Sequence, residues 1–537
     1  MKIVLAEKVS PATLAVLQDE SSWQVVTHDQ IKKGLAAELA DADGLVVRSA
    51  VQVDDALLEA APKLRVIGRA GVGVDNIDAD AATRRGIVVM NTPGANAIAV
   101  AELTIGLMLA LGRQLPRANA LLHAGKWEKK SLQGTELRGK QLGILGLGRV
   151  GLEVARRAKA FGMELLGHDP FVTPAIAREN GVRLCTVDEL FRDSDYLTLH
   201  VGLTPQTAGI INARTLATMR KSARIVNCAR GELIDDAALV EAIRSGQVAG
   251  AALDVFSQEP LKDSAYFGLD NVILTPHIAG STGEAQEAVG IQIAMQVKEY
   301  LKFGVVQNAV NLPSMTFDEY QELSPYILMA ERLGAFLSPL AVGNLESIHL
   351  SYSGRLAQGK TDLVRNAAIQ GVLAHSEVVN RINSLSVAAE RGIRVHEEKS
   401  EGGSGGAGTV LKITLHTGTG DTTASATVLH GSSPRLLSCD GIDIEAPLHG
   451  TLLFIRNLDV PGVIGRIGTI LGQHKMNIAN FALGRSQRTG QHNALAVVQI
   501  DGGVTPSVVA ALQATEAITE VRLIELADRQ PALATSE

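Results

Sequence analysis

Three glycines in the first third of the chain are spaced to bind a dinucleotide. Gly146, Gly148 and Gly151 form a G-x-G-x-x-G pattern between the apolar run LGIL and the helix-like segment LEVARRAKAFG. The first glycine permits a tight turn, the second lets the backbone approach a pyrophosphate, and the third lets strand and helix pack closely. A helix N-terminus then stabilises the phosphates. The pattern alone could be a glycine-rich turn, but its position between strand and helix favours dinucleotide binding.

A carboxylate after the next strand-like run indicates which dinucleotide is bound. Asp169 ends MELLGHD, 18 residues after Gly151. A carboxylate at that position accepts hydrogen bonds from ribose hydroxyls and repels a 2′-phosphate. The following Pro170 and Phe171 supply no arginine to receive such a phosphate. We therefore expect the cofactor to be NAD rather than NADP.

Three later strand ends each carry one polar residue that a passive fold does not need. Arg230 closes ARIVNCARG, Glu259 follows ALDVFS, and His277 follows VILTP. Ligands of an open parallel sheet bind beyond the carboxyl ends of its strands, so we expect these side chains to converge. Taken singly, they could be a surface ion pair, a turn residue and a helix cap.

Together the three residues fit hydride transfer between a secondary alcohol and nicotinamide. His277 would take the hydroxyl proton, or return it in the reverse reaction. Glu259 would stabilise the imidazolium and fix its tautomer. Arg230 would hold the carboxylate of a 2-hydroxy acid and polarise the oxygen at C2.

The elements that position these residues are those of α/β folds. Apolar runs rich in Val, Ile and Leu alternate with helical patterns over residues 2–91, beginning with KIVLA rather than a secretory signal. A second such series starts at Lys140. This alternation is typical of parallel sheets buried on both faces, so each series predicts a doubly wound sheet.

Composition narrows the class of protein. The 537 residues predict several domains, and their 46% hydrophobic content predicts globular cores. A net charge of −7 gives no basic surplus for nucleic acid or an anionic membrane. The three cysteines are far apart, which argues against a disulfide framework and a structural zinc site. We expect a cytoplasmic protein without a metal.

The pattern changes after Pro313. Residues 314–448 predict a mixed α+β domain with helices over about 317–340 and 361–391 and strands at 411–417 and 423–431. We interpret the glycine-rich segment 402–408 within it as a surface turn without chemistry. Residues 451–527 read strand, helix, strand, strand, helix, strand, which is the ferredoxin-like βαββαβ order.

Residues 1 to about 312 resemble the D-isomer-specific 2-hydroxyacid dehydrogenases, through NCARGELID, ALDVFSQEP and TPHIAGST. The resemblance implies a discontinuous substrate-binding lobe of residues 1–98 and 283–312, an NAD-binding lobe of residues 99–282, and a cleft that closes on a hinge. It assigns the catalytic roles to Arg230, Glu259 and His277, of which Arg230 and His277 also contact substrate and cofactor. Further NAD contacts map to Arg149, Val150, Cys228, Ala229, Asp254, Ala279 and Gly280.

Two arginines of the substrate-binding lobe could hold a phosphorylated substrate. Arg48 and Arg69 both follow predicted strands, although either could be a solvated surface charge. Asn96 is a further expected substrate contact. The segment GKWEKK resembles a family segment that crosses a dimer interface, where Lys129 would add charge to a neighbour's site.

Residues 456–481 resemble an ACT domain, an amino-acid-sensing module. The resemblance implies effector contacts around Asp459 and Asn477, at an interface between two such domains. Asn457 and Asp459 occupy the polar loop positions here, so we expect Asn457 to contribute as well, although a purely structural role in dimerisation stays open. Dehydrogenase, intervening domain and ACT domain together resemble the long form of the family. That form implies oxidation of 3-phosphoglycerate by NAD at the first step of serine synthesis, L-serine as effector, and a homo-oligomer, either dimer or tetramer.

Two other functions remain open at this point. One is a different D-2-hydroxyacid specificity, such as glyoxylate or hydroxypyruvate reduction, with an idle ACT domain. The other is a binding protein without activity that uses the dehydrogenase fold to sense NADH.

Overall fold

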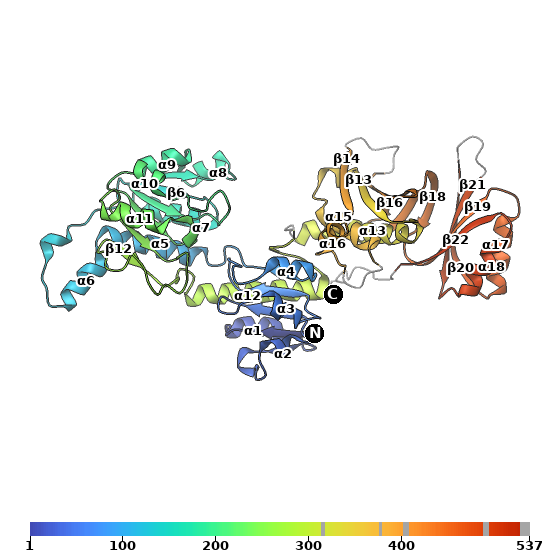
Figure 1. The fold of residues 1–537 in the computed structure, drawn as a ribbon, viewed down its shortest axis with the longest axis horizontal. Helices are drawn as coiled ribbons and strands as arrows, with labels where there is room; N and C mark the ends of the chain where they lie inside the picture. The colour runs from blue at the N-terminus through green and yellow to red at the C-terminus, as the bar shows by residue number, and fades with distance from the viewer. Residues whose placement is uncertain (313–316, 375–378, 401–407, 487–492, 527–537) are drawn as a thin grey trace.

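The computed structural model describes residues 1–312, 317–374, 379–400, 408–486 and 493–526. Four sheets follow one another along the chain, as Figure 1 shows. The first two are wholly parallel, and the last is antiparallel. This arrangement confirms the predicted α/β class with its ferredoxin-like C-terminal end.

The first sheet has the doubly wound strand order β2-β1-β3-β4-β5. Its strands are β1 (Lys2–Leu5), β2 (Gln24–Val26), β3 (Gly44–Val47), β4 (Val66–Arg69) and β5 (Val88–Met90). Helix α12 (Gly283–Phe303) comes from far along the chain and packs on β4 at Gly68, where a Cβ would lie 2.7 Å from Ile293 Cγ1. Residues remote in sequence therefore share one core.

Four short helices connect the strands of this sheet. They are α1 (Pro11–Gln18), α2 (Leu35–Leu39), α3 (Asp55–Glu59) and α4 (Ala79–Arg84). Asp54 and Asp78 cap α3 and α4 by accepting hydrogen bonds from the backbone of the first turn.

The second sheet is the predicted dinucleotide-binding fold. Its order is β12-β11-β10-β9-β6-β7-β8, so the progression of strands along the chain reverses between β6 and β9, next to the glycine motif. The strands are β6 (Gln141–Leu145), β7 (Glu164–His168), β8 (Val182–Leu184), β9 (Tyr196–Leu199), β10 (Arg224–Asn227), β11 (Gly250–Leu253) and β12 (Val272–Leu274). The edge strand β8 was not predicted, because only three residues form it and one of them is exposed.

The most apolar stretch of the chain forms helix α5 (Ala97–Gly112), which packs against α7 (Arg149–Ala160). In the described part of the chain, no single helix is long and apolar enough to cross a membrane. Helices α5 and α6 (Leu115–His123), bent by 62°, meet that test only as a pair. Helix α6 projects away from the second sheet in Figure 1.

The third sheet differs in part from the expectation for residues 314–448. It has six strands, ordered β14-β13-β15-β16-β17-β18, whereas only two strands were predicted. Those two correspond to β15 (Val410–Thr417) and β16 (Gly420–Leu429). The four missed strands are β13 (Leu345–Ser353), β14 (Arg394–Ser400), β17 (Ser433–Cys439) and β18 (Ile442–Pro447). Residues 402–407 of the predicted glycine-rich turn lie outside the described residues.

The helix expected over about 361–391 is wrong as a single element. Among the described residues of this range, which leave out 375–378, the structure has two helices, α15 (Asp362–Val372) and α16 (Ser384–Glu390). Asparagine side chains compete with helical hydrogen bonds, and Asn380 accepts bonds from the backbone of Ile382 and Asn383 just before α16. The expectation for 317–340 is confirmed, with α13 (Phe317–Leu337) followed by the 3₁₀ turn Ser338–Leu340.

The fourth sheet has the predicted βαββαβ order. Strands β19 (Gly450–Leu458), β20 (Asn477–Arg485), β21 (Asn493–Asp501) and β22 (Ile518–Leu526) are arranged β20-β21-β19-β22. Helices α17 (Val463–Gln473) and α18 (Pro506–Gln513) contact each other and share a core with the sheet. Phe454 of β19 meets Phe336 of α13 edge-on, which joins the third and fourth sheets.

Candidate functional site

The glycine motif forms a turn shaped for a pyrophosphate. Gly146 has φ +93°, and a Cβ there would lie 2.6 Å from the His200 carbonyl oxygen. A Cβ at Gly151 would clash with the Gly146 carbonyl oxygen. Gly148 faces open space, because no atom of the described residues lies within 4 Å of the position that a Cβ would take, and α7 begins immediately after it. The turn therefore leaves an open approach to the helix N-terminus, which fits the phosphates of NAD.

Asp169 holds this turn to the end of β7. Its carboxylate accepts hydrogen bonds from Leu147 N and Phe171 N, both at 2.8 Å. The side chain thus lies between the glycine turn and the next loop, where it would accept hydrogen bonds from the adenosine ribose of a bound dinucleotide.

Replacing Asp169 with alanine is expected to lower the NAD-to-NADP ratio of kcat/KM by about tenfold or more, because a charge-assisted hydrogen bond to ribose is lost. Initial rates with each cofactor measure this ratio. Asp188→Ala, at an exposed carboxylate of the same lobe, is the control. An unaltered ratio in Asp169→Ala would mean that another group reads the ribose.

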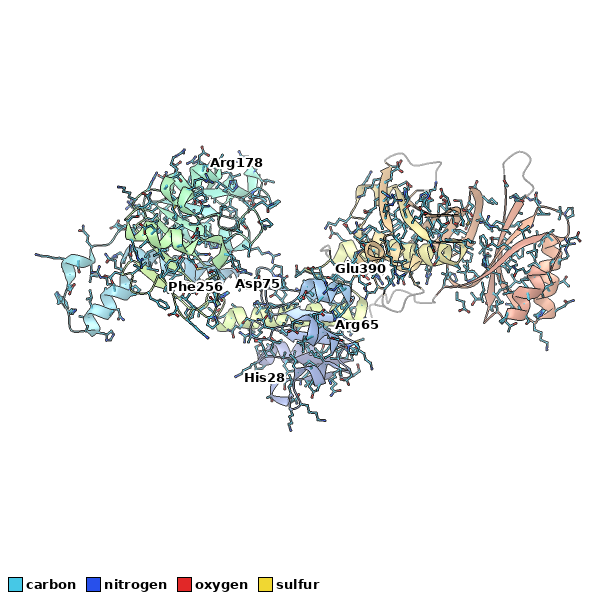
Figure 2. The ribbon with its side chains drawn as sticks, in the orientation of Figure 1. His28, Arg65, Asp75, Arg178, Phe256 and Glu390 are labelled. Atoms are coloured by element: carbon cyan, nitrogen blue, oxygen red, sulfur yellow. The ribbon has the colours of Figure 1, made fainter. Side chains whose placement is uncertain are left out.

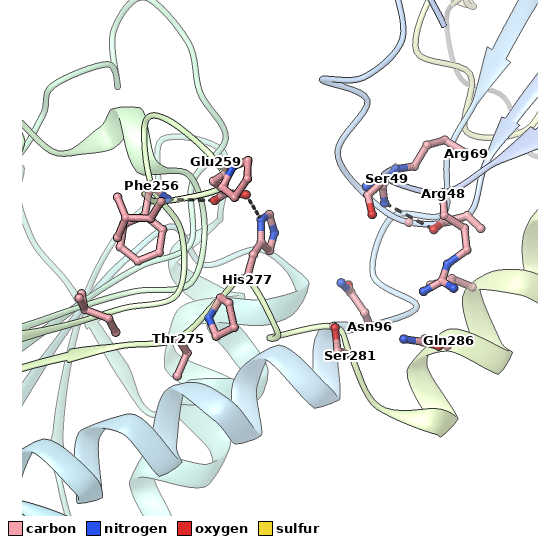
Figure 3. Close-up of a pocket in the computed structure, with 18 residues that line it drawn as sticks. Arg48, Ser49, Arg69, Asn96, Phe256, Glu259, Thr275, His277, Ser281 and Gln286 are labelled. Carbon is pink, nitrogen blue, oxygen red and sulfur yellow. Dashed lines mark hydrogen bonds and ion pairs between the residues drawn. The ribbon is translucent and has the colours of Figure 1, made fainter. Parts of the chain in front are cut away.

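His277 and Glu259 form a hydrogen-bonded pair. His277 Nδ1 lies 2.8 Å from Glu259 Oε2, and Glu259 Oε1 accepts a 3.0 Å hydrogen bond from Phe256 N. Figure 3 shows both contacts. With Nδ1 engaged by the carboxylate, Nε2 is the ring nitrogen available for proton transfer.

Buried Asp254 orders the loop that carries this histidine. Its Oδ1 accepts hydrogen bonds from Thr275 Oγ1 (2.6 Å) and Ile278 N (2.9 Å), and its Oδ2 accepts one from Ala279 N (2.9 Å). Its carbonyl accepts a 2.9 Å bond from His277 N. Asp254 was expected to contact NAD. In the structure its side chain is fully buried and stabilises the loop that carries His277.

A cleft of about 700 Å³ opens beside His277. Figure 3 shows Arg48, Ser49 and Arg69 facing it from one side and Glu259 and His277 from the other. The structure thus brings together five residues predicted to act on the substrate: Arg48, Arg69, Asn96, Glu259 and His277. Gly280 also lines the cleft. Polar lining residues that the sequence did not single out are Ser49, Thr275, Ser281 and Gln286.

The arginine side of the cleft is electropositive. Burial lowers the pKa of the Arg69 guanidinium, and the charge of Arg230 lowers it further. Arg69 Nε and Asn96 Oδ1 are buried and have no hydrogen-bond partner among the described residues. Arg48 Nη1 donates to the Lys8 carbonyl at 3.2 Å. Clustered guanidinium groups of this kind suit an anionic ligand.

Arg230 does not line this cleft. Its Nη2 lies 3.3 Å from Asp75 Oδ2, and its Nη1 donates to the Ala229 carbonyl at 2.7 Å. Arg230 nevertheless lies beside the loop that follows Arg69, because a Cβ at Gly73 would clash with its Nη2. Arg149, which follows β6 of the second sheet, also contacts the first lobe, because its guanidinium donates a hydrogen bond to the Pro93 carbonyl.

The remaining predicted NAD contacts lie near the carboxyl ends of β6, β10 and the edge strand β12. Cys228 is buried, which raises the pKa of its thiol to about 12 and keeps it protonated at neutral pH. Ala279 is also buried, whereas Ala229 and Val150 are partly exposed. Nearby, burial lowers the pKa of His200 to about 3, so this histidine stays neutral beside the glycine turn.

A second cleft, of about 460 Å³, lies in the ferredoxin-like unit. Its lining includes Asn457, Asp459 and Arg485 together with the segment 460–464 that leads into α17. Arg485 Nε lies 3.4 Å from Asp459 Oδ1, and Asn457 Oδ1 is buried without a partner among the described residues. Asn477, the third predicted effector contact, is not in this lining and donates to Asp501 Oδ2 at 2.5 Å.

Comparison with known proteins gives three family matches along the chain. Residues 105–279 match the D-isomer specific 2-hydroxyacid dehydrogenase, NAD binding domain. Residues 322–440 match the D-3-phosphoglycerate dehydrogenase intervening domain, and residues 451–517 match the ACT domain.

Individual relatives extend over nearly the whole chain. The chain is 41% identical to D-3-phosphoglycerate dehydrogenase of Methanocaldococcus jannaschii, over 98% of this chain and 100% of that protein. For the protein of the same name from Synechocystis sp., the identity is 39%, over 98% and 95%. The solved structure of D-lactate dehydrogenase from Aquifex aeolicus, complexed with NAD and lactic acid, matches with a TM-score of 0.52 and 30% identity, over 58% of this chain and 100% of that one.

Proposed function

This chain belongs to the D-3-phosphoglycerate dehydrogenase family of NAD-dependent D-2-hydroxyacid dehydrogenases, and from that premise we propose that it oxidises 3-phospho-D-glycerate to 3-phosphooxypyruvate with NAD. This reaction would be the first step of phosphorylated L-serine synthesis. NAD supplies the hydride acceptor when bound, and the residues of the chain bind the acid, orient it and move its hydroxyl proton.

His277 is the proposed proton acceptor at the C2 hydroxyl. Its Nδ1 is held by Glu259, so Nε2 takes the proton, and the Glu259 carboxylate stabilises the imidazolium that results. The two hydrogen bonds of Glu259 and the loop contacts of Asp254 fix the ring before substrate arrives.

Arg230, Arg48 and Arg69 are proposed to bind the two anionic ends of the substrate. Arg230 takes the carboxylate and polarises the C2 oxygen, which needs Arg230 to turn toward the cleft as the lobes close. Arg48 and Arg69 take the phosphate, which carries about −1.5 to −2 charges at neutral pH. Asn96 would contact the substrate between them.

The observation that carries this proposal is the cleft that places Arg48 and Arg69 opposite the His277–Glu259 pair. An assay of NADH formation from 3-phospho-D-glycerate, with the product trapped chemically, tests it. We expect turnover with NAD. An enzyme that is inert with this acid and with every other 2-hydroxy or 2-keto acid tested would instead support an NADH-sensing protein.

We propose the domain limits 1–98 with 283–312 for substrate binding, 99–282 for NAD binding, 314–448 for the intervening domain and 451–527 for the ACT domain. We also propose a homo-oligomer, dimer or tetramer. The exposed arm around α6 supports this, because no residue of α6 is buried and Trp127 is 82% exposed. The cysteine-poor composition supports a cytoplasmic location.

L-serine is the proposed effector at the second cleft. Asp459 offers a carboxylate for the ammonium group, and Arg485 and the N-terminus of α17 offer cationic and N–H partners for the carboxylate. A purely structural role of this unit in dimerisation is the alternative.

We expect calorimetry to detect L-serine binding at millimolar concentration or below, and Asp459→Ala to weaken it about tenfold or more, since a hydrogen bond to a charged group is lost. Glu516→Ala is the control, at an exposed carboxylate of the same unit that does not line the cleft. Absence of heat in the wild-type protein, or equal weakening by both substitutions, would contradict the proposal.

A further inference from the structure

Arg230 and Asp75 form an ion pair that bridges the two lobes. Arg230 follows β10 of the second sheet, and Asp75 lies in the loop between β4 and α4 of the first. Their Nη2 and Oδ2 atoms are 3.3 Å apart. Figure 2 shows Asp75 at the junction of the lobes. Arg230, the proposed carboxylate-binding residue, is therefore already paired with a carboxylate at the junction between the lobes.

The local backbone leaves room for this pair. A Cβ at Gly73 would clash with Arg230 Nη2 and would lie 2.7 Å from Asp75 Oδ2. Arg230 and Asp75 thus meet over a residue that has no side chain. The Asp75 side chain is 75% exposed and that of Arg230 is 27% exposed, so Asp75 can move away into solvent and leave Arg230 free to turn toward the cleft.

Glu7, a second carboxylate beside Arg69, is already engaged. Glu7 accepts hydrogen bonds from the backbone N–H groups of Arg48 (2.8 Å), Val51 (3.2 Å) and Ala50 (3.3 Å). Among the described residues, Asp75 is the carboxylate within 4 Å of the Arg230 guanidinium. Asp75 therefore stands where an anionic ligand of Arg230 would place its own oxygen atoms.

We propose that Asp75 is a positioning residue that pairs with Arg230 in the unliganded enzyme and is displaced from it by the carboxylate of the substrate. The inference rests on the proposed function, in which Arg230 binds that carboxylate. While the cleft is empty, Asp75 neutralises one of three clustered guanidinium groups. The substrate exchanges one ion pair for another, so Asp75 reduces the net gain from binding any anion at Arg230.

Asp75→Asn tests this exchange, because it removes the charge and keeps the shape. We expect KM for 3-phospho-D-glycerate to fall about two- to fivefold, the range set by partly exposed ion pairs, with kcat within about twofold of wild type. Asp75→Glu, which restores the carboxylate, should return KM toward the wild-type value. Asp80→Asn is the matched control, at a carboxylate five residues further on, and should leave KM unchanged.

Binding of oxalate, a dicarboxylate without a phosphate group, followed by calorimetry, separates this inference from the proposed function. We expect Asp75→Asn to bind oxalate more tightly than wild type, whether or not the enzyme oxidises 3-phospho-D-glycerate. Wild-type inactivity toward that acid would overturn the proposed function alone. A KM and an oxalate affinity that Asp75→Asn leaves unchanged or weakens, a loss confined to kcat, or an equal effect of Asp80→Asn would overturn the inference.

Discussion

His277→Ala is expected to lower kcat by about 10²-fold or more while NAD still binds, because positioned proton transfer typically contributes a factor of that size. In the structure, His277 Nδ1 is held 2.8 Å from Glu259, and no second imidazole lines the cleft among the described residues. Steady-state rates measure the loss, and titration with NADH measures retained cofactor binding.

His28→Ala provides the control, since His28 lies in the 3₁₀ turn His28–Gln30 and does not line the cleft. It should leave both kcat and NADH affinity unchanged. If His277→Ala retained wild-type turnover, His277 would have no part in the proton transfer, and the roles proposed for Glu259 and Asp254 would fall with it.

Arg230→Lys is expected to lower kcat/KM for 3-phospho-D-glycerate by about 10²- to 10³-fold. Lysine keeps the charge but cannot hold a carboxylate with two parallel hydrogen bonds, and a desolvated charge pair of this kind contributes strongly to binding. NADH affinity should change little, because the glycine turn and the N-terminus of α7 that would hold the pyrophosphate are unaltered.

Arg214→Lys is the control, at an exposed arginine of the same lobe. It should retain wild-type kcat/KM. If Arg230→Lys lowered kcat/KM only slightly, the positive charge alone would be sufficient. Arg230 would then attract the substrate electrostatically without orienting its carboxylate.

The dinucleotide site was predictable because its signals are local. Gly146 and Gly151 are required by close contacts within one turn, Gly148 leaves that turn open to a ligand, and Asp169 lies at the end of the adjacent strand. Parallel strands also place their carboxyl ends at one edge, so the approach of Glu259 and His277 followed from the fold.

The contacts between the two lobes could not be predicted from the sequence, because they join residues that are far apart in it. The Arg230–Asp75 pair and the contact of Arg149 with the Pro93 carbonyl cross from one sheet to the other, and no local pattern marks them. Asp75 could have been singled out only by its position in the loop after β4.

The strands of the third sheet, in the predicted domain 314–448, were predicted less completely, for a different reason. Its strand β13 alternates buried and exposed residues imperfectly, β17 alternates buried with only partly exposed residues, and β14 is almost wholly exposed, so apolar periodicity indicates these strands weakly. Asn477, expected as an effector contact from its position at the start of a strand, does not line the second cleft. Its side chain donates a hydrogen bond to Asp501 on β21 instead.

The central claim is that the arginine side of the cleft selects a phosphorylated acid for the His277–Glu259 pair. The most direct measurement is the ratio of kcat/KM for 3-phosphooxypyruvate to that for hydroxypyruvate, both reduced with NADH by the wild-type enzyme. We predict a ratio of about 10² or more, since a phosphate paired with arginine gains several charge-assisted hydrogen bonds. A ratio near one, or a preference for hydroxypyruvate or glyoxylate, would contradict the account and assign the enzyme to unphosphorylated hydroxy acids.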